Sequence, residues 1–143
     1  MTDTGLSISM IRSLDWATIW RAAVSTATFA VPLTLLQWWL IETDRASKGD
    51  SLMLLLNLAI MGSGALGGFA AAKLAPRLAL QHGAVAPALA AIAIQIVGAI
   101  RRSIVGEEVS NVLGWIMLAL LMAVFGMFGA WVNEKVSPPR TEG

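Results

Sequence analysis

The longest uncharged stretch of the chain covers residues 109–133 and reads VSNVLGWIMLALLMAVFGMFGAWVN. A helix rises 1.5 Å per residue and the hydrocarbon layer of a membrane is about 30 Å thick, so about 20 apolar residues cross it once. Continuous runs of leucine and alanine differ from a membrane-spanning strand, which shows roughly ten-residue alternating segments. This 25-residue stretch therefore predicts a transmembrane helix.

Three further uncharged stretches have the same character. They hold 20, 22 and 23 residues and occupy 22–41, 51–72 and 78–100. The chain is therefore predicted to be an all-α, polytopic membrane protein with a four-helix bundle over residues 16–133. The predicted spans are 20–41, 51–72, 84–105 and 112–132. Residues 1–15 and 134–143 are predicted to be tails, and the first of these has apolar residues spaced for a short interfacial helix.

Composition gives the same answer. Of 143 residues, 57% are hydrophobic and 13% charged, against roughly 45–50% and about 25% in soluble domains. The net charge of +1 leaves no basic surplus for nucleic acid. There is no cysteine and a single histidine, His82, so no metal cluster or cofactor site is expected. We expect His82 to lie in a loop and to be solvated.

Tryptophan placement supports the spans, because the indole ring favours the headgroup level of a membrane. Trp16, Trp20 and Trp131 fall at one predicted interface. The other interface receives Trp38, Trp39 and Trp115. Trp20 and Trp38 are separated by about 27 Å of helix, which is close to the hydrocarbon thickness.

Positive charges predict the orientation. Six lie on the side of the termini: Arg12, Arg21, Lys73, Arg77, Lys135 and Arg140. Four lie on the opposite side: Arg45, Lys48, Arg101 and Arg102. The positive-inside rule therefore predicts cytoplasmic termini. Lys73, Arg77, Arg101, Arg102, Lys135 and Arg140 are expected to form basic rims that attract anionic lipid or a partner.

Small residues indicate how the spans pack. Shifting the chain by 62 residues places Gly64, Gly67, Lys73 and Pro76 on Gly126, Gly129, Lys135 and Pro138. This pattern predicts a parallel repeat of two helices plus two. Small residues four apart let helix backbones approach closely in lipid. The expected helix-packing residues are Gly64, Gly67, Gly68, Ala72, Gly126, Gly129 and Ala130.

The stretch GGFAAAKLAPR at residues 67–77, followed by His82-Gly83-Ala84, resembles a group of small four-helix membrane proteins of Gram-positive, actinobacterial-type bacteria. The resemblance covers about 20 residues of small and apolar types. It implies a multi-pass protein of the bacterial cytoplasmic membrane and carries no activity to transfer.

Polar side chains inside the predicted spans are few. Gln37, Asn57 and Gln95 are the neutral candidates, and the Gln95 amide is expected to bond a neighbouring helix rather than a substrate. No charge lies in the four cores, which counts against ion-coupled transport. Pro32 is expected to bend the first span, because proline removes one backbone donor. Glu107 and Glu108 are adjacent on a loop and form no catalytic pair.

These features predict a protein that is not an enzyme. We expect an accessory, assembly or structural subunit that associates through small-residue helix faces with another membrane protein or a second copy. The alternative is a small transporter or channel that acts as a dimer. Gln37, Asn57 and Gln95 alone are too few to form a polar path across the bilayer.

Overall fold

The computed structural model describes residues 14–109 and 111–137, and they form four long helices. The helices are α2 (Trp16–Glu42), α3 (Ser51–Leu74), α4 (Ala79–Val105) and α5 (Val112–Val136), with a single 3₁₀ turn, η1 (Pro76–Leu78), before α4. Each of the four is long and apolar enough to cross a membrane. The protein is thus an all-α, four-helix, multi-pass membrane protein.

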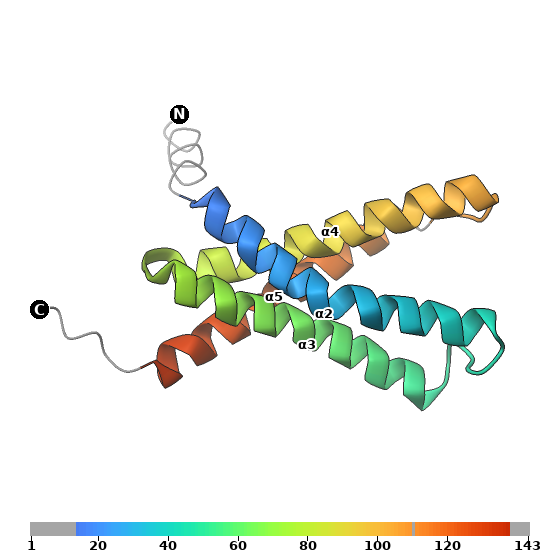
Figure 1. Ribbon diagram of the computed structural model, residues 1–143, viewed down its shortest axis with the longest axis horizontal. Helices are drawn as coiled ribbons and strands as arrows, with labels where there is room; N and C mark the ends of the chain where they lie inside the picture. Colours follow the sequence, from blue (N-terminus) through green and yellow to red (C-terminus); the bar gives the residue numbers. More distant parts are fainter. Residues whose placement is uncertain (1–13, 110, 138–143) are drawn as a thin grey trace, which may run out of the picture.

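The helices alternate in direction and leave two ends of the bundle (Figure 1). We call the end with the start of α2, η1 and the end of α5 the termini end. The loop end holds residues 43–50 and 106–111. Figure 1 shows the helices meeting near the termini end and spreading apart toward the loop end, where the α2–α3 hairpin lies apart from the α4–α5 hairpin.

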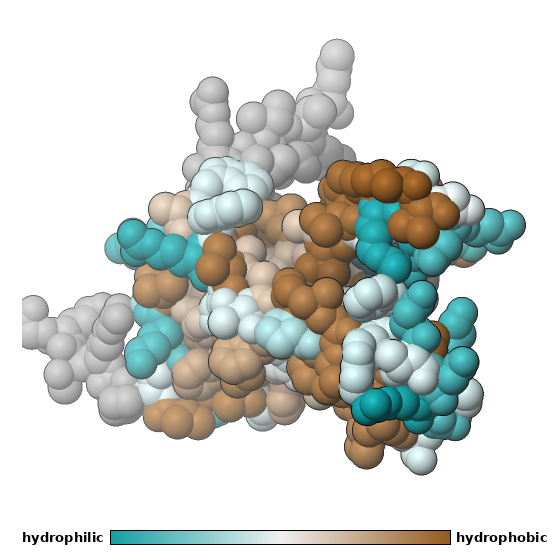
Figure 2. Space-filling view, turned by 45° about the vertical axis from the view of Figure 1, so that its right-hand side comes forward, coloured by the Kyte–Doolittle hydropathy of each residue, from teal (hydrophilic) through white to brown (hydrophobic). Residues whose placement is uncertain are grey.

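Two helices are central and two are peripheral. α3 and α4 each contact all three other helices, whereas α2 and α5 make no contact with each other among the described residues. Most side chains in the spans face outward, and brown hydrophobic residues cover much of the visible surface (Figure 2). This is the arrangement expected where lipid replaces water as the solvent.

Local signals explain where the helices begin and end. Asp15 and Asn111 cap α2 and α5 by accepting hydrogen bonds from the backbone N–H groups of Ala17 (3.1 Å) and Gly114 (2.8 Å). α4 ends at Gly106, whose φ of 76° is the left-handed conformation that favours glycine at this position. α2 continues through Pro32 without interruption.

Three helix ends differ from the predicted boundaries by four or five residues. α2 starts at Trp16 rather than residue 20, α4 starts at Ala79 rather than residue 84, and α5 ends at Val136 rather than residue 132. α2 and α5 extend past the predicted ends because polar residues such as Arg21 and Lys135 continue them into the membrane interface. The added turns of α4 lie within the uncharged stretch 78–100, which the predicted start at residue 84 left out. Residues 1–13 and 138–143, including Arg140 and the predicted interfacial helix, lie outside the described residues.

Candidate functional site

Three of the four helices meet through small residues, at what we call the glycine crossing: Gly67 and Gly68 of α3, Gly83 of α4, and Gly126 and Gly129 of α5. Methyl groups added to these glycines would overlap a neighbouring helix. A Cβ on Gly68 would strike the carbonyl group of Gly126, and one on Gly126 would strike the carbonyl oxygen of Gly83. Three backbones are thus in van der Waals contact, as small residues permit in lipid.

The helix-packing residues predicted from sequence are all buried inside this chain. α3 meets α5 where a Cβ on Gly129 would overlap the carbonyl group of Ala65, and Met122 packs against Gly64. Ala72 and Ala130 form a small cluster with Ala79. The small-residue faces are therefore occupied by intramolecular contacts, and a partner would meet other faces of the bundle.

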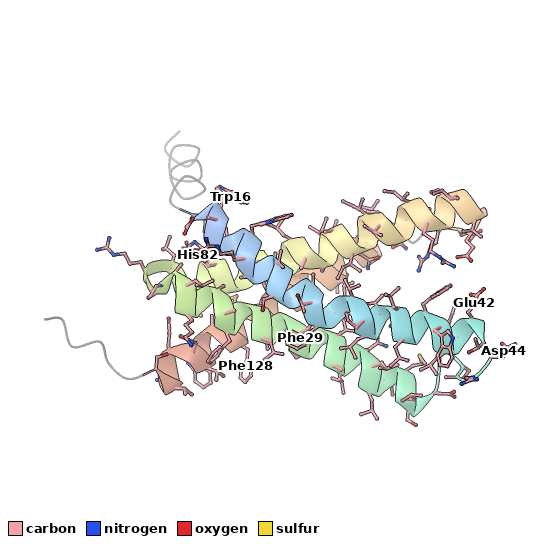
Figure 3. The ribbon with its side chains drawn as sticks, in the orientation of Figure 1. Trp16, Phe29, Glu42, Asp44, His82 and Phe128 are labelled. Atoms are coloured by element: carbon pink, nitrogen blue, oxygen red, sulfur yellow. The ribbon has the colours of Figure 1, made fainter. Side chains whose placement is uncertain are left out.

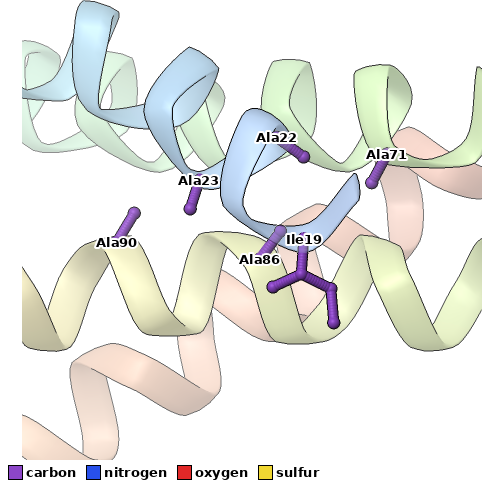
Figure 4. Close-up of a cluster of buried hydrophobic side chains, with 6 residues drawn as sticks. All are labelled: Ile19, Ala22, Ala23, Ala71, Ala86 and Ala90. Carbon is purple, nitrogen blue, oxygen red and sulfur yellow. The ribbon is translucent and has the colours of Figure 1, made fainter. Parts of the chain in front are cut away.

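A second group of small residues joins α2 to α3 and α4. Ile19, Ala22 and Ala23 of α2 pack against Ala71 of α3 and Ala86 and Ala90 of α4 (Figure 4). Close by, a Cβ on Gly67 would overlap the hydroxyl of Thr26, which is fully buried and donates to the Ala22 carbonyl (3.1 Å). Sequence reasoning did not select these residues. The small-residue spacing Ala79, Gly83, Ala86 and Ala90 is the signal that was available.

His82 corrects the expectation of a solvated loop histidine. It lies in α4 and is only 2% exposed. Its Nε2 accepts a hydrogen bond from the Asp15 backbone N–H (3.0 Å), so its Nδ1–H donates to the Leu78 carbonyl (2.9 Å). The expectation is wrong because α4 begins five residues before residue 84, the start of the predicted span. Figure 3 shows His82 near Trp16, where α2 begins.

Asp15 links the histidine to the start of α2. Its carboxylate accepts from the Thr18 hydroxyl (2.6 Å) and from the Ala17 N–H. The Thr18 hydrogen bond lowers the pKa of the Asp15 carboxyl group from its ordinary value. The Asp15 side chain thus caps α2, while the Asp15 backbone N–H binds His82 of α4, so this one residue joins the two helices at the termini end.

Polar contacts within the spans are sparse. The Gln37 amide donates to the Asn57 side-chain oxygen (3.3 Å), which joins α2 to α3 in the half of the bundle near the loop end. Gln95 is half-buried and its side chain makes no hydrogen bond with any other described residue. The interhelical side-chain hydrogen bond within the spans comes from the Gln37–Asn57 pair instead. A polar path along the bundle is not present in the part of the chain that the structure describes.

An apolar groove opens between α2 and α4, with a volume of about 510 Å³. We call it the α2–α4 groove. It begins beside Trp20, and it ends at Trp38, Arg101 and Arg102. Between these ends its walls are aliphatic; among the lining residues are Val24, Val31, Leu35, Ala93, Val97 and Gly98. The groove exists because α2 and α4 pack only near the termini end and then diverge (Figure 1).

Arginine side chains at the loop end stack on tryptophan rings. The Arg101 guanidinium lies 4.5 Å from the centre of the Trp38 ring, and that of Arg45 lies 4.6 Å from the Trp39 ring. Arg101 also approaches Glu107 at 3.8 Å. Such contacts hold cationic groups at the membrane interface. At the termini end, the Lys135 ammonium lies 6.0 Å from the Trp131 ring, and Lys73 and Arg77 are exposed.

Trp115 differs from the other interfacial tryptophans. It is half-buried near the start of α5, and its indole nitrogen is buried without a hydrogen-bond partner among the described residues. It lines a second, smaller apolar depression between α4 and α5.

Acidic side chains and the single histidine do not gather into one cluster in the described part of the chain. Across residues 14–109 and 111–137, no three histidine, aspartate or glutamate side chains come together as metal ligands. Glu107 and Glu108 are both exposed in the loop after α4. No family model matches this chain, and no similarity to a curated protein or to a solved structure is found.

Proposed function

We propose that this chain is a non-catalytic membrane protein that serves as an accessory, assembly or structural subunit. It binds another membrane protein or a second copy of itself through lipid-facing helix surfaces. The observation that carries the proposal is the glycine crossing, where α3, α4 and α5 touch through their backbones. Such packing makes a closely packed apolar body, which favours a binding role over catalysis or transport.

The surfaces offered to a partner are the outer faces of the bundle, since the small-residue faces are buried. Leu58 on α3 and Val124 on α5 are 57% and 61% exposed, so each of these two helices presents a large aliphatic side chain on its outer surface. Large aliphatic side chains on such faces interdigitate with those of another helix by van der Waals packing.

Site-specific photo-cross-linking tests association. With p-benzoylphenylalanine in place of Leu58 or Val124, irradiation of intact membranes is expected to give an adduct with one defined protein or with a second copy. Samples kept in the dark give the background. If neither position yields a protein adduct and the chain elutes as a partnerless monomer in mild detergent, the accessory role is wrong.

The alternative role, a small transporter or channel, requires a polar path. Within one copy, the glycine crossing and the uncharged middle of each span count against such a path. Vesicles reconstituted with the chain are therefore expected to show ion and small-solute flux no higher than protein-free vesicles. Flux above that level would favour a path between two copies.

We also propose that the protein resides in a bacterial cytoplasmic membrane with both termini in the cytoplasm. The six-to-four distribution of positive charges supports this orientation. A duplication of two helices plus two is part of the proposal, supported by the glycines of α3 and α5 that face each other. The symmetry is imperfect, because α3 contacts α4 whereas α2 and α5 do not touch.

A further inference from the structure

The α2–α4 groove has the shape of a trough with one polar end. Over the distance from Trp20 to Trp38 its walls consist almost entirely of aliphatic side chains. Thr34 is the exception, and its hydroxyl donates to the Ala30 carbonyl of its own helix (2.8 Å). The α2–α4 groove therefore offers its occupant contact with hydrocarbon, and its one hydroxyl donor is already used within α2. A sugar, an ion or an amino acid would lose its hydration there without replacement.

The polar end is cationic. Arg101 and Arg102 line the groove where it meets the loop end, and the Arg101 guanidinium stacks on the Trp38 ring. Guanidinium groups match phosphate oxygens in geometry and charge, and they are more weakly hydrated than ammonium groups. Glu107 reduces the local positive charge but stands 3.8 Å from Arg101, beyond hydrogen-bond distance.

We propose that the α2–α4 groove binds one phospholipid with an anionic headgroup, from the leaflet at the loop end. Its phosphate lies at Arg101 and Arg102, and an acyl chain runs along Val97 and Val31 toward the termini end. This lipid site is independent of the proposed protein partner, which binds other faces.

Size and charge favour a lipid over a partner helix. The groove volume of about 510 Å³ lies within the roughly 300–1,000 Å³ typical of small-molecule sites. A transmembrane helix of about 20 residues, about 10 Å wide and 30 Å long, occupies on the order of 2,000 Å³. A helix would also need an acidic residue at interface depth to meet the two arginines, whereas a phosphate is part of every phospholipid.

The test is selective lipid retention. The chain is reconstituted in bilayers of equimolar dioleoyl-phosphatidylglycerol and dioleoyl-phosphatidylcholine, extracted in a neutral detergent and examined by native mass spectrometry. We expect one retained lipid per chain and a preference for phosphatidylglycerol of about fivefold for each arginine, the usual effect of a basic residue near a membrane surface. Equal retention of the two lipids by the wild-type chain would overturn the proposal.

Two pairs of matched variants locate the site. The double variant Arg101→Gln, Arg102→Gln is expected to lose the preference for phosphatidylglycerol. The control is the double variant Arg45→Gln, Lys48→Gln, which also removes two positive charges at the loop end but outside the groove. It is expected to keep the preference. Gly98→Leu fills the groove and is expected to abolish retention of both lipids. Gly62→Leu is its control, because a Cβ at either glycine meets no atom within 4 Å. If a variant and its control lose the lipid preference, or lipid retention, to the same extent, the proposal is overturned.

A photo-cross-linker identifies the occupant directly. Val97 is 68% exposed and lines the groove. With p-benzoylphenylalanine in place of Val97, the expected adduct is one phospholipid, enriched in phosphatidylglycerol relative to the bilayer. The same residue in place of Leu66, which is 52% exposed and lies outside the groove, should give lipid adducts that mirror the bilayer composition. A protein adduct at position 97 would place a partner helix in the groove and would overturn the lipid assignment.

Discussion

Replacement of Gly126 by alanine is expected to destabilise the bundle by about 3 kcal/mol, at the upper end of the usual cost of overpacking. The new methyl group would overlap the carbonyl oxygen of Gly83 and would lie 2.6 Å from Cγ of Pro87. Neither atom can be moved by a side-chain rotation, because one is backbone and the other belongs to a proline ring. Relief therefore requires α4 and α5 to separate.

Thermal unfolding in detergent, followed by tryptophan fluorescence, measures this effect. Gly62→Ala is the matched control, since a Cβ at Gly62 meets no atom within 4 Å. Alanine exceeds glycine in helix propensity by about 1 kcal/mol, so the control should unfold at the wild-type temperature or above it. The same substitution is thus expected to lower the unfolding temperature at Gly126 and to leave it unchanged or raise it at Gly62. A Gly126→Ala variant as stable as Gly62→Ala would show that the glycine crossing is not a backbone contact.

The substitution His82→Phe is expected to destabilise the protein by about 2 kcal/mol, the typical cost of leaving buried hydrogen-bonding groups unpaired. Phenylalanine retains a planar ring but removes the acceptor of the Asp15 N–H and the donor to the Leu78 carbonyl. The start of α2 would lose its link to α4. Hydrogen exchange at the Asp15 amide, together with the unfolding temperature, reports both consequences.

The control for His82 is its neighbour Gln81, which is half-buried and forms no hydrogen bond through its side chain with other described residues. Gln81→Leu should leave the Asp15 amide as protected as in the wild-type chain. If His82→Phe also leaves the exchange rate and the unfolding temperature unchanged, the histidine does not hold the two helices together.

Charge spacing predicts the number of spans and most of their ends, because the cost of burying a charge in hydrocarbon is large and local. α3 begins at Ser51, α4 ends at Val105 and α5 begins at Val112, at the boundaries of the predicted spans. The predicted spans leave out the first turns of α2 and α4. Those turns are held by the capping side chain of Asp15 and by the buried His82, and charge spacing carries no information on either contact.

The sequence predicts the glycines of the crossing on α3 and α5, because they repeat at a fixed offset or, for Gly68, lie four residues from other small residues. Gly83 and Pro87 of α4 have no such repeat and were missed. The inward face of each span is also hard to identify, since the helices are apolar on all sides and periodicity distinguishes little. The α2–α4 groove depends on the angle at which two helices diverge, and no local pattern encodes that angle.

Cysteine accessibility tests most directly whether the four helices cross a membrane. The chain has no native cysteine, so single substitutions at the exposed residues Lys48, Arg77 and Glu108 give unique labels for three loops. In intact cells, Lys48→Cys and Glu108→Cys are predicted to react with a membrane-impermeant maleimide, and Arg77→Cys only after permeabilisation. Equal reaction of all three from one side would contradict the four crossings.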